Sequence, residues 1–427
     1  MRRVVLLAAG SRGDTVPQVA LARALQERGA TVLVLGIGEY ADVAAAAAVP
    51  FVPIAAAAGV AEHTPAWLIR GAQDRTTATS YVLWSWLKRE ATSIAAAVDA
   101  HVHHGDLLLS GIMAIDLATA LVRARGCLGV HVTFAATLPT AYGPSFCLAP
   151  MPHRVSPVNA WFSRHHAWPG SVRFSLPPGL ALRRRLGLPE HGIFAAARDA
   201  AALPTLVAST PVLVPAAPDW PLQTTLTGPW LPEADHSWTP PGRLAAFLAA
   251  GPPPVYVGFG SMLATDPDAD LRLIAQAATR AGIRVVVRRN EHDRRTAPMP
   301  MPMLPDHVHA IDDAPHEWLF PRMAAVVHHG GAGTTIAGLR AGVPTGIVSH
   351  TMDQPHQGRR IASVGAGPAH LPRRRLTADR LTSLFIALTS GPQAAGYRAR
   401  AAAVGDLVRA EDGIGTTIAH LADRGWL

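Results

Sequence analysis

The chain has 427 residues, of which 49% are hydrophobic and 16% charged, and its formal net charge is +8. This length predicts two domains, and the hydrophobic content excludes extensive disorder. The positive charge comes almost entirely from dispersed arginines, since Lys88 is the single lysine, and no nucleic-acid-binding motif is present. We therefore expect no nucleic-acid partner, whereas peripheral contact with an anionic membrane surface stays open.

The cysteines and the N-terminus indicate a cytoplasmic protein. Cys127 and Cys147 are too few for a disulfide framework and fit free thiols in a reducing compartment. The apolar run at the N-terminus is short and passes into Ser-Arg-Gly-Asp, which predicts a first strand rather than a signal peptide. No stretch is long and apolar enough to predict a membrane-spanning helix.

The first half of the chain has the pattern of a parallel α/β domain. Residues 4–8 predict a buried strand, Gly29 ends a helical pattern that contains Pro17, and residues 31–35 predict the next strand. A strand, a helix and a strand in this order form a βαβ unit, so we predict an α/β fold with a parallel sheet. Further strands are expected at 106–109, 129–134 and 205–209.

Residues 137–178 are rich in proline and aromatic residues and show no clear periodicity. A segment of this length is usually functional or mobile. The alternative is a loop that its own aromatic side chains pack onto the surface. A proline-dense stretch then predicts a linker at residues 213–240.

The α/β pattern restarts after the linker. Strands are predicted at 255–258, 285–288, 308–311, 324–327 and 343–348, and helices at 270–281, 318–321, 378–388, 394–409 and 414–424. We predict an N-terminal domain at 1–212, a C-terminal domain at 241–405, and a helical segment at 406–427 that can pack back on the N-terminal domain. The sequence contains no internal repeat.

The most informative stretch joins the strand at 324–327 to a helix start. It reads HHGGAGTT at residues 328–335. Glycines allow close approach of the backbone to an anion, and the N–H groups and dipole of a helix start favour phosphate. A diphosphate is therefore the predicted ligand, although a glycine-rich turn alone also occurs as ordinary turn chemistry. The strand at 343–348 ends in His350, Asp353 and Gln354, whose side chains suit the hydroxyls of a sugar.

These motifs together resemble those of family 1 glycosyltransferases, which transfer a sugar from a nucleotide diphosphate to a small acceptor. The resemblance rests on HHGGAGTT, AGVP at 341–344, DQPHQGRR at 353–360, VYVGFGSM at 255–262, APHEWLFPRM at 314–323 and GSRGDTVP at 10–17. The last of these resembles the antibiotic-aglycone branch, and the others the bacterial and sterol-type branches. The resemblance implies a GT-B fold, in which two Rossmann-like parallel-sheet domains face each other across a cleft.

The resemblance also assigns residues to the nucleotide-sugar donor. His329, Gly331, Gly333, Thr334 and Ser261 would hold the diphosphate, Ala314 and His316 the base, and Asp353 and Gln354 the sugar. No metal or other cofactor is expected, because backbone N–H groups, a helix dipole and an imidazole can stabilise the departing diphosphate. Adjacent strand histidines point to opposite faces, so His328 and His329 are not expected to share a metal ion.

The catalytic base is predicted in the first loop. The plant branch has a histidine at the position of Asp14, whereas the antibiotic branch has the aspartate, so Asp14 is our candidate general base for an inverting transfer. The helix start is expected to lower its pKa. The alternative is that Asp14 only caps the helix. Ser11 and Arg12 could complete this loop, and His131 is a reserve base that could equally be a buried structural histidine.

The predicted reaction moves a hexose, with glucose favoured, from UDP or dTDP to a hydroxyl of a hydrophobic natural product. A sterol or another lipid is the alternative acceptor. A sugar epimerase of the GT-B fold and a degenerate, non-catalytic partner protein also stay open. A nicotinamide-dependent oxidoreductase is disfavoured, because the first turn reads GSRGDT instead of GxGxxG.

Overall fold

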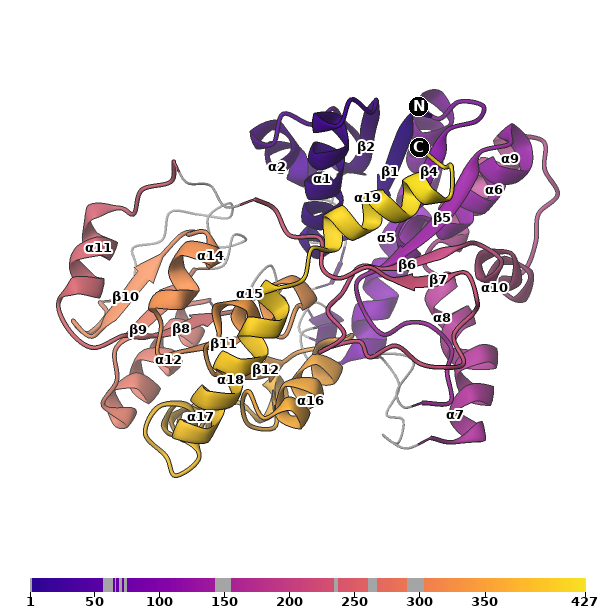
Figure 1. Cartoon of the computed structure of the whole chain (residues 1–427). Helices are drawn as coiled ribbons and strands as arrows, with labels where there is room; N and C mark the ends of the chain where they lie inside the picture. Colours follow the sequence, from indigo (N-terminus) through magenta and orange to yellow (C-terminus); the bar gives the residue numbers. More distant parts are fainter. Residues whose placement is uncertain are drawn as a thin grey trace. The chain divides into compact units, whose positions relative to one another are not determined.

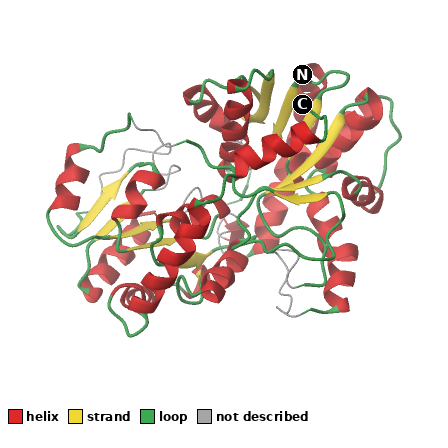
Figure 2. Ribbon diagram, viewed as in Figure 1, coloured by secondary structure: helices red, strands yellow, loops and turns green. Residues whose placement is uncertain are grey.

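The computed structural model divides the chain into two compact units (Figures 1 and 2). It describes residues 2–56, 64–65, 67–68, 71–72, 75–142, 155–233, 237–259, 267–289 and 303–427. The first unit consists of Met1–Pro65, Ser80–Glu233 and Glu411–Leu427, and the second of Ala66–Thr79 and Ala234–Ala410.

The first unit is built on a parallel sheet with the strand order β3-β2-β1-β4-β5-β6-β7. Its strands are β1 (Val4–Ala8), β2 (Val32–Ile37), β3 (Phe51–Ala55), β4 (Leu107–Ser110), β5 (Leu128–Thr133), β6 (Thr205–Val207) and β7 (Thr224–Leu226). Its helices are α1 (Arg12–Glu27), α2 (Ala41–Ala46), α5 (Thr76–His101), α6 (Ile115–Arg125), α7 (Pro157–Phe162), α8 (Trp168–Val172), α9 (Leu176–Arg185), α10 (Ile193–Ala201) and α19 (Gly413–Asp423). β7 pairs with β6 and lies within the range 213–240 that we predicted as a linker.

Helices cover both faces of this sheet, because successive side chains along β1 point to opposite faces and are apolar on both. Val5 and Leu7 pack with buried residues of α5, α6 and α9, whereas Val4 and Leu6 pack with those of α1 and α19. A strand that is buried on both faces reads as a continuous apolar run, which is the pattern of residues 4–8.

The last helix packs back on the N-terminal sheet, as predicted. Thr417 of α19 accepts a hydrogen bond from the indole N–H of the buried Trp230 at 2.7 Å. Thr210 donates to Glu411 at 2.6 Å, and Arg2 donates to the carbonyl of Gly425 at 3.2 Å. The two chain ends therefore lie together in this unit (Figure 1).

The second unit has a parallel sheet with the order β10-β9-β8-β11-β12-β13. Its strands are β8 (Val255–Gly258), β9 (Val285–Arg288), β10 (Val308–Ile311), β11 (Ala325–His328), β12 (Thr345–Ser349) and β13 (Leu371–Pro372). Its helices are α11 (Gly242–Ala249), α12 (Pro267–Ala281), α14 (His316–Leu319), α15 (Ala332–Ala341), α16 (Gln354–Val364), α17 (Ala378–Thr389) and α18 (Ala394–Arg409). One face of the sheet packs with buried residues of α12 and α17, and the other with those of α11 and α14.

The segment 137–178, predicted to lack regular structure, is largely helical where the structure describes it. Val155 bridges to Tyr142, and a nearly continuous helix then runs from α7 through the π-helical turn η3 (Ser163–Ala167) into α8. Ser156 caps α7 by accepting from the N–H of Val158 at 3.2 Å, and Pro157 occupies the first helical position. The expectation of an irregular loop was therefore wrong for residues 157–172.

Candidate functional site

The central site of the second unit lies where the strand order reverses, between β8 and β11. In open parallel sheets, ligands bind beyond the carboxyl ends of the strands at such a switch point. β8 ends at Gly258 and β11 at His328, and these two residues are register partners. The glycine-rich loop begins directly after His328, so the sheet itself brings the predicted diphosphate loop to this position.

The two histidines of the loop have different surroundings. His328 is fully buried, and its Nδ1 accepts a hydrogen bond from the N–H of Gly330 at 3.0 Å. Burial and the neighbouring His329 and His316 lower its pKa well below the ordinary value. His328 is therefore a neutral residue that shapes the turn from inside.

His329 is half-buried and therefore more exposed than His328, although its Nδ1 is itself buried. Burial lowers its pKa to about 4, a hydrogen bond with the backbone of Gly258 opposes the shift, and the positive charge of Arg288 adds to it. A neutral imidazole has one N–H group, so His329 could donate to a phosphate oxygen only in exchange for its hydrogen bond with Gly258. The interaction with Gly258 also places His329 across the switch point, between the ends of β11 and β8.

The glycines of the loop leave the start of α15 open. Gly330 has φ +93°, a conformation that favours glycine, and a Cβ there would lie 2.8 Å from Cγ2 of Ile347. Gly331 is the N-cap of α15, and no side chain caps this helix start. Gly333 is exposed, and outside its own helix no atom of the described residues lies within 4 Å of the position a Cβ would take. The uncapped N–H groups therefore face an open space that can take an anion.

The residues predicted to face the nucleotide base lie on the loop after β10. Ala314 is buried, and its N–H donates to Oδ1 of Asp313 at 3.1 Å. His316 begins α14, and its ring stacks on that of Phe320 with centroids 4.3 Å apart. The ring of Tyr256 meets the His316 ring edge-on, with centroids 6.1 Å apart. Burial raises the pKa of Tyr256, so its hydroxyl stays protonated. Near the end of this segment the guanidinium of Arg322 covers the ring of Trp318, with its carbon 4.2 Å from the ring centroid.

The loop after β12 carries the residues predicted to hold the sugar. Oε1 of Gln354 accepts from the N–H groups of His350 at 2.7 Å and Thr351 at 3.2 Å, so this oxygen holds the loop in shape. Asp353 is the N-cap of α16 and accepts from Nε2 of Gln357 at 3.4 Å. Met352 has φ +58°, which is strained backbone for a side chain of this kind. The structure thus gives Gln354 a positioning role that the sequence did not predict.

Ser261, also predicted to contact the diphosphate, lies outside the described residues. Within the described ranges, no group of three or more His, Cys, Asp and Glu side chains comes close enough together to hold a metal ion.

In the first unit, Asp14 is the third residue of α1 and not its N-cap, which is Ser11. Its Oδ2 accepts from the N–H of Ser11 at 2.8 Å and from the Ser11 hydroxyl at 3.1 Å. The two residues form a capping box. Burial raises the pKa of Asp14 above its ordinary value, and the hydrogen bonds from Ser11 only oppose this shift. The expectation that the helix start lowers this pKa was wrong, because desolvation is the larger effect.

The other residues predicted for this loop occupy different settings. Arg12 is the first residue of α1 and is half-buried. His131 is fully buried in β5, where its Nδ1 lies 3.1 Å from the carbonyl of Ser110 and its ring meets Trp168 edge-on. Burial lowers its pKa to about 4. These surroundings favour the structural alternative for His131.

Arg288 is a site residue that sequence reasoning missed. It ends β9, lies close enough to His329 to lower its pKa, and pairs with Asp313 at 3.2 Å. Its position at the carboxyl end of the predicted strand at 285–288 could have indicated a site residue. In the sequence alone, Arg288 was recognisable only as part of the short basic run Arg288-Arg289.

Comparison with known proteins gives a family match for the C-terminal half and relatives for most of the chain. Residues 270–412 match the family described as erythromycin biosynthesis protein CIII-like, C-terminal domain. A sterol 3-beta-glucosyltransferase of Emericella nidulans is 28% identical over 97% of this chain and 29% of its own length. The sterol 3-beta-glucosyltransferase UGT80B1 of Arabidopsis thaliana is 29% identical over 89% of this chain and 62% of its own length. The chain thus spans less than a third of the fungal relative and less than two thirds of the plant one.

Solved structures show the same fold. The glycotransferase of kitacinnamycin superposes with a TM-score of 0.67 at 21% identity, covering 100% of this chain and 99% of its own. The calicheamicin glycosyltransferase CalG4 gives 0.68 at 18% identity, covering 99% and 98%. These likenesses confirm the GT-B fold, and together with the sequence relatives they confirm the resemblance to family 1 glycosyltransferases.

Proposed function

Because the chain has the GT-B fold and resembles family 1 glycosyltransferases along nearly its whole length, we propose that it is an inverting, nucleotide-sugar-dependent glycosyltransferase. The observation that carries this proposal is the loop between β11 and α15. There the uncapped helix start, the open face of Gly333 and the half-buried His329 combine at the switch point of the sheet. This combination suits the diphosphate of a nucleotide sugar.

The proposed donor site stabilises the leaving group. As the bond between the anomeric carbon and the phosphate oxygen breaks, negative charge accumulates on the nucleoside diphosphate. N–H groups at the start of α15 can donate to this charge, His329 can join them if its N–H turns from Gly258 to the diphosphate, and the Arg288 guanidinium adds a positive field near His329. The helix N–H groups and Arg288 are already in place before the reaction, so the proposal requires no metal ion.

The proposed base is Asp14. The acceptor hydroxyl oxygen attacks the anomeric carbon while its proton passes to the Asp14 carboxylate, and inversion follows from attack opposite the leaving group. A raised pKa makes the carboxylate a stronger base than an ordinary aspartate, which favours proton removal from an alcohol. The bonds from Ser11 engage Oδ2, so Oδ1 is the oxygen that would take the proton.

The proposed donor is UDP- or dTDP-glucose, and the proposed acceptor is a hydrophobic hydroxyl compound. Two observations favour different acceptors. The sequence relatives are named as sterol glucosyltransferases, whereas the solved structures include a glycosyltransferase with a spinosyn aglycone and one with dTDP. A hydrophobic natural product is the first proposal, and a sterol is the second.

The test combines purified protein with UDP-glucose or dTDP-glucose and a panel of sterols and polycyclic natural products. Mass spectrometry should find an acceptor gaining one hexose, and NMR of the product should show a β-linkage from the α-linked donor. Formation of an epimerised nucleotide sugar without acceptor would assign an epimerase instead. Failure to bind either nucleoside diphosphate in calorimetry would refute the proposal at its first step.

A further inference from the structure

A helix of the first unit turns its apolar side chains outward. Along α7 and η3, Asn159 and Ser163 are fully buried, whereas Val158 and Trp161 are 69% and 56% exposed. Just before the helix, Val155 is 62% exposed and bridges to Tyr142, which is 51% exposed. We call Tyr142, Val155, Val158 and Trp161 the α7 surface. This arrangement is the reverse of the amphipathic pattern of a water-facing helix.

The buried polar residues are held in place by the protein. Ser163 donates to the carbonyls of Asn159 and, at 3.3 Å, Thr140. Asp219 accepts from the N–H of Ala141 at 2.7 Å and from the Thr140 hydroxyl. The bond from Ser163 to Thr140 joins the helix to the preceding segment and, with the burial of Asn159, sets which side of the helix faces inward, so Val158 and Trp161 face outward.

The sequence that contains the α7 surface is rich in positive charge, and Asp219 is a carboxylate that the structure places beside it, on the N–H of Ala141. Residues 117–189 contain no Asp or Glu, but they contain Arg123, Arg125, Arg154, Arg164, Arg173, Arg183, Arg184 and Arg185. Four of these arginines pair with carboxylates from outside that range, in the contacts Arg125–Asp99, Arg183–Asp116, Arg184–Glu190 and Arg185–Asp99. Arg164 and Arg173 remain on the same helical run as the α7 surface, and both are exposed.

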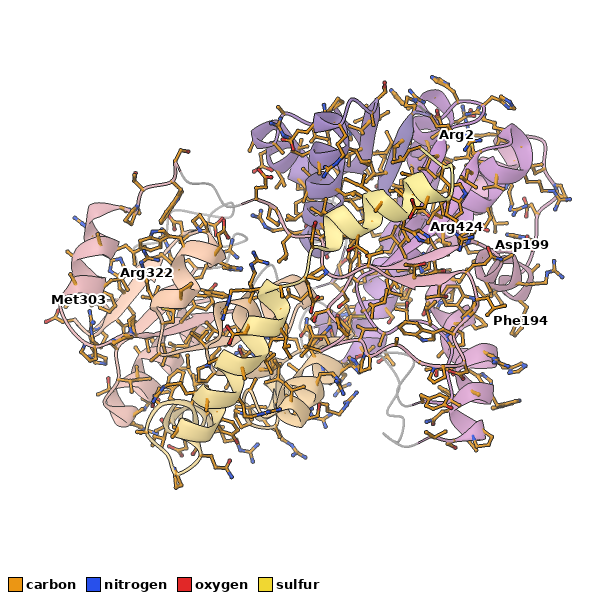
Figure 3. All side chains as sticks on the ribbon, in the orientation of Figure 1. Arg2, Phe194, Asp199, Met303, Arg322 and Arg424 are labelled. Atoms are coloured by element: carbon orange, nitrogen blue, oxygen red, sulfur yellow. The ribbon has the colours of Figure 1, made fainter. Side chains whose placement is uncertain are left out.

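The residues after Trp161 extend the surface with aromatic and basic groups. The ring of His165 stacks on Trp161 at 5.5 Å, and that of His166 meets it edge-on at 5.0 Å. Tryptophan beside histidine and arginine is typical of segments that lie at a membrane interface, where the ring sits at headgroup depth and the cations contact anionic lipids. Phe194 on α10, a helix that packs against α8, is a further exposed aromatic residue of this unit (Figure 3).

We propose that the α7 surface is a peripheral docking site for an anionic phospholipid membrane. No helix among the described residues is long and apolar enough to cross a bilayer, so this contact would be interfacial. A second copy of the chain fits less well, because two such surfaces would bring arginines against each other. The proposal goes beyond glycosyl transfer and does not depend on it.

Flotation with lipid vesicles tests the proposal. Vesicles of phosphatidylcholine alone are compared with vesicles in which a third of the lipid is phosphatidylglycerol. We expect the protein to float with the anionic vesicles, and the double variant Val158→Ser/Trp161→Ser to lose about tenfold or more in partition coefficient. The double variant Arg164→Gln/Arg173→Gln should lose binding to anionic vesicles, and high salt should weaken binding of the unaltered protein.

The matched control is Leu407→Ser, because Leu407 is 63% exposed on α18 in the second unit. This control should float as the unaltered protein does, and the thermal unfolding midpoints of all variants should agree, since the altered side chains are exposed. An equal loss for Leu407→Ser, or no flotation with anionic vesicles, would overturn the proposal. Dimerisation that Trp161→Ser abolishes, without vesicle binding, would assign the surface to a second copy. The flotation assay contains no nucleotide sugar and no acceptor. A negative result would therefore refute the membrane proposal and leave the transferase proposal unaffected.

Discussion

The substitution Gly333→Ala tests the proposed diphosphate site without disturbing the fold. Gly333 is the second residue of α15, and among the residues that the structure describes no atom outside this helix lies within 4 Å of the added methyl group. Alanine is the better helix former, so the variant should be as stable as the unaltered protein or up to about 1 kcal/mol more stable. The same methyl group would occupy the space in front of the helix start, where the diphosphate is proposed to lie.

The expected loss of affinity follows from the hydrogen bonds that the methyl group obstructs. A hydrogen bond to a charged group contributes about 1.5–3 kcal/mol, so displacing the diphosphate from one N–H group should raise Kd for UDP by about 10- to 100-fold. KM for the sugar donor should rise by a similar factor. Stability and affinity are thus predicted to change in opposite directions.

Isothermal titration with UDP measures the affinity, and urea unfolding measures the stability. The matched control is Gly396→Ala, since Gly396 lies near the start of α18 in the same unit and also has no atom within 4 Å of an added Cβ. Gly396→Ala should gain similar stability and bind UDP normally. If Gly333→Ala bound UDP as tightly as Gly396→Ala does, the diphosphate would not lie against this helix start.

Three further predictions concern stability and catalysis. Gly330→Ala should lower the free energy of unfolding by about 2–4 kcal/mol in urea titration, because φ +93° and a contact of 2.8 Å with Ile347 both penalise a Cβ; an unchanged midpoint would refute this. Asp14→Asn should lower kcat by about 10²- to 10⁴-fold while UDP affinity stays constant. In the pH profile of the unaltered enzyme, kcat/KM should fall on the acid side with an apparent pKa above the ordinary pKa of aspartate. The pKa of His131 is lowered to about 4, so the unfolded chain binds more protons at this residue below pH 6.5, and His131 alone should lower stability by roughly 3 kcal/mol from pH 7.5 to 4. His131→Phe should remove that part of the pH dependence, and identical slopes for the two proteins would contradict the reasoning.

The sheets were predictable because their strands are buried on both faces. The strands at 4–8, 255–258, 285–288 and 308–311 have the predicted bounds, since each is a short apolar run between turn residues. β3 was missed because Pro53 interrupts it, and β13 because it has only two residues. These strands lie at sheet edges, where proline and short length are tolerated and the apolar signal is weak.

The helices of the first unit were harder to predict, because tertiary contacts decide which residues they bury. α5 runs for 26 residues, but its tryptophans and charged residues obscured the helical period. α7 and η3 bury Asn159 and Ser163, whereas Val158 and Trp161 of α7 are exposed, so this pattern opposes the rule by which helices are recognised. A reversed pattern of this kind can be interpreted only after the partners of the buried polar groups are known.

The candidate site was predictable where one loop carries it and less so where several strands meet. The sequence identified the glycine-rich loop, because its backbone requirements are local. It could not show that Arg288 lies beside His329, since β9 and β11 are separated by β8 in the sheet. It also gave no sign that the side-chain oxygen of Gln354 accepts hydrogen bonds from the backbone N–H groups of His350 and Thr351. These bonds span the strained turn at Met352, which the sequence does not reveal.

Asp14 shows why a capping role and a catalytic role are compatible in one side chain. A capping box requires an acceptor at the third helical position, and Oδ2 satisfies it through Ser11. Those hydrogen bonds fix the rotamer of the carboxyl group, while burial raises its pKa and makes it a stronger base. An asparagine at this position keeps an oxygen for Ser11, so it should change the free energy of unfolding by less than about 1 kcal/mol. Loss of turnover without loss of stability would therefore separate the base from the cap, whereas loss of both in proportion would assign Asp14 to the cap alone.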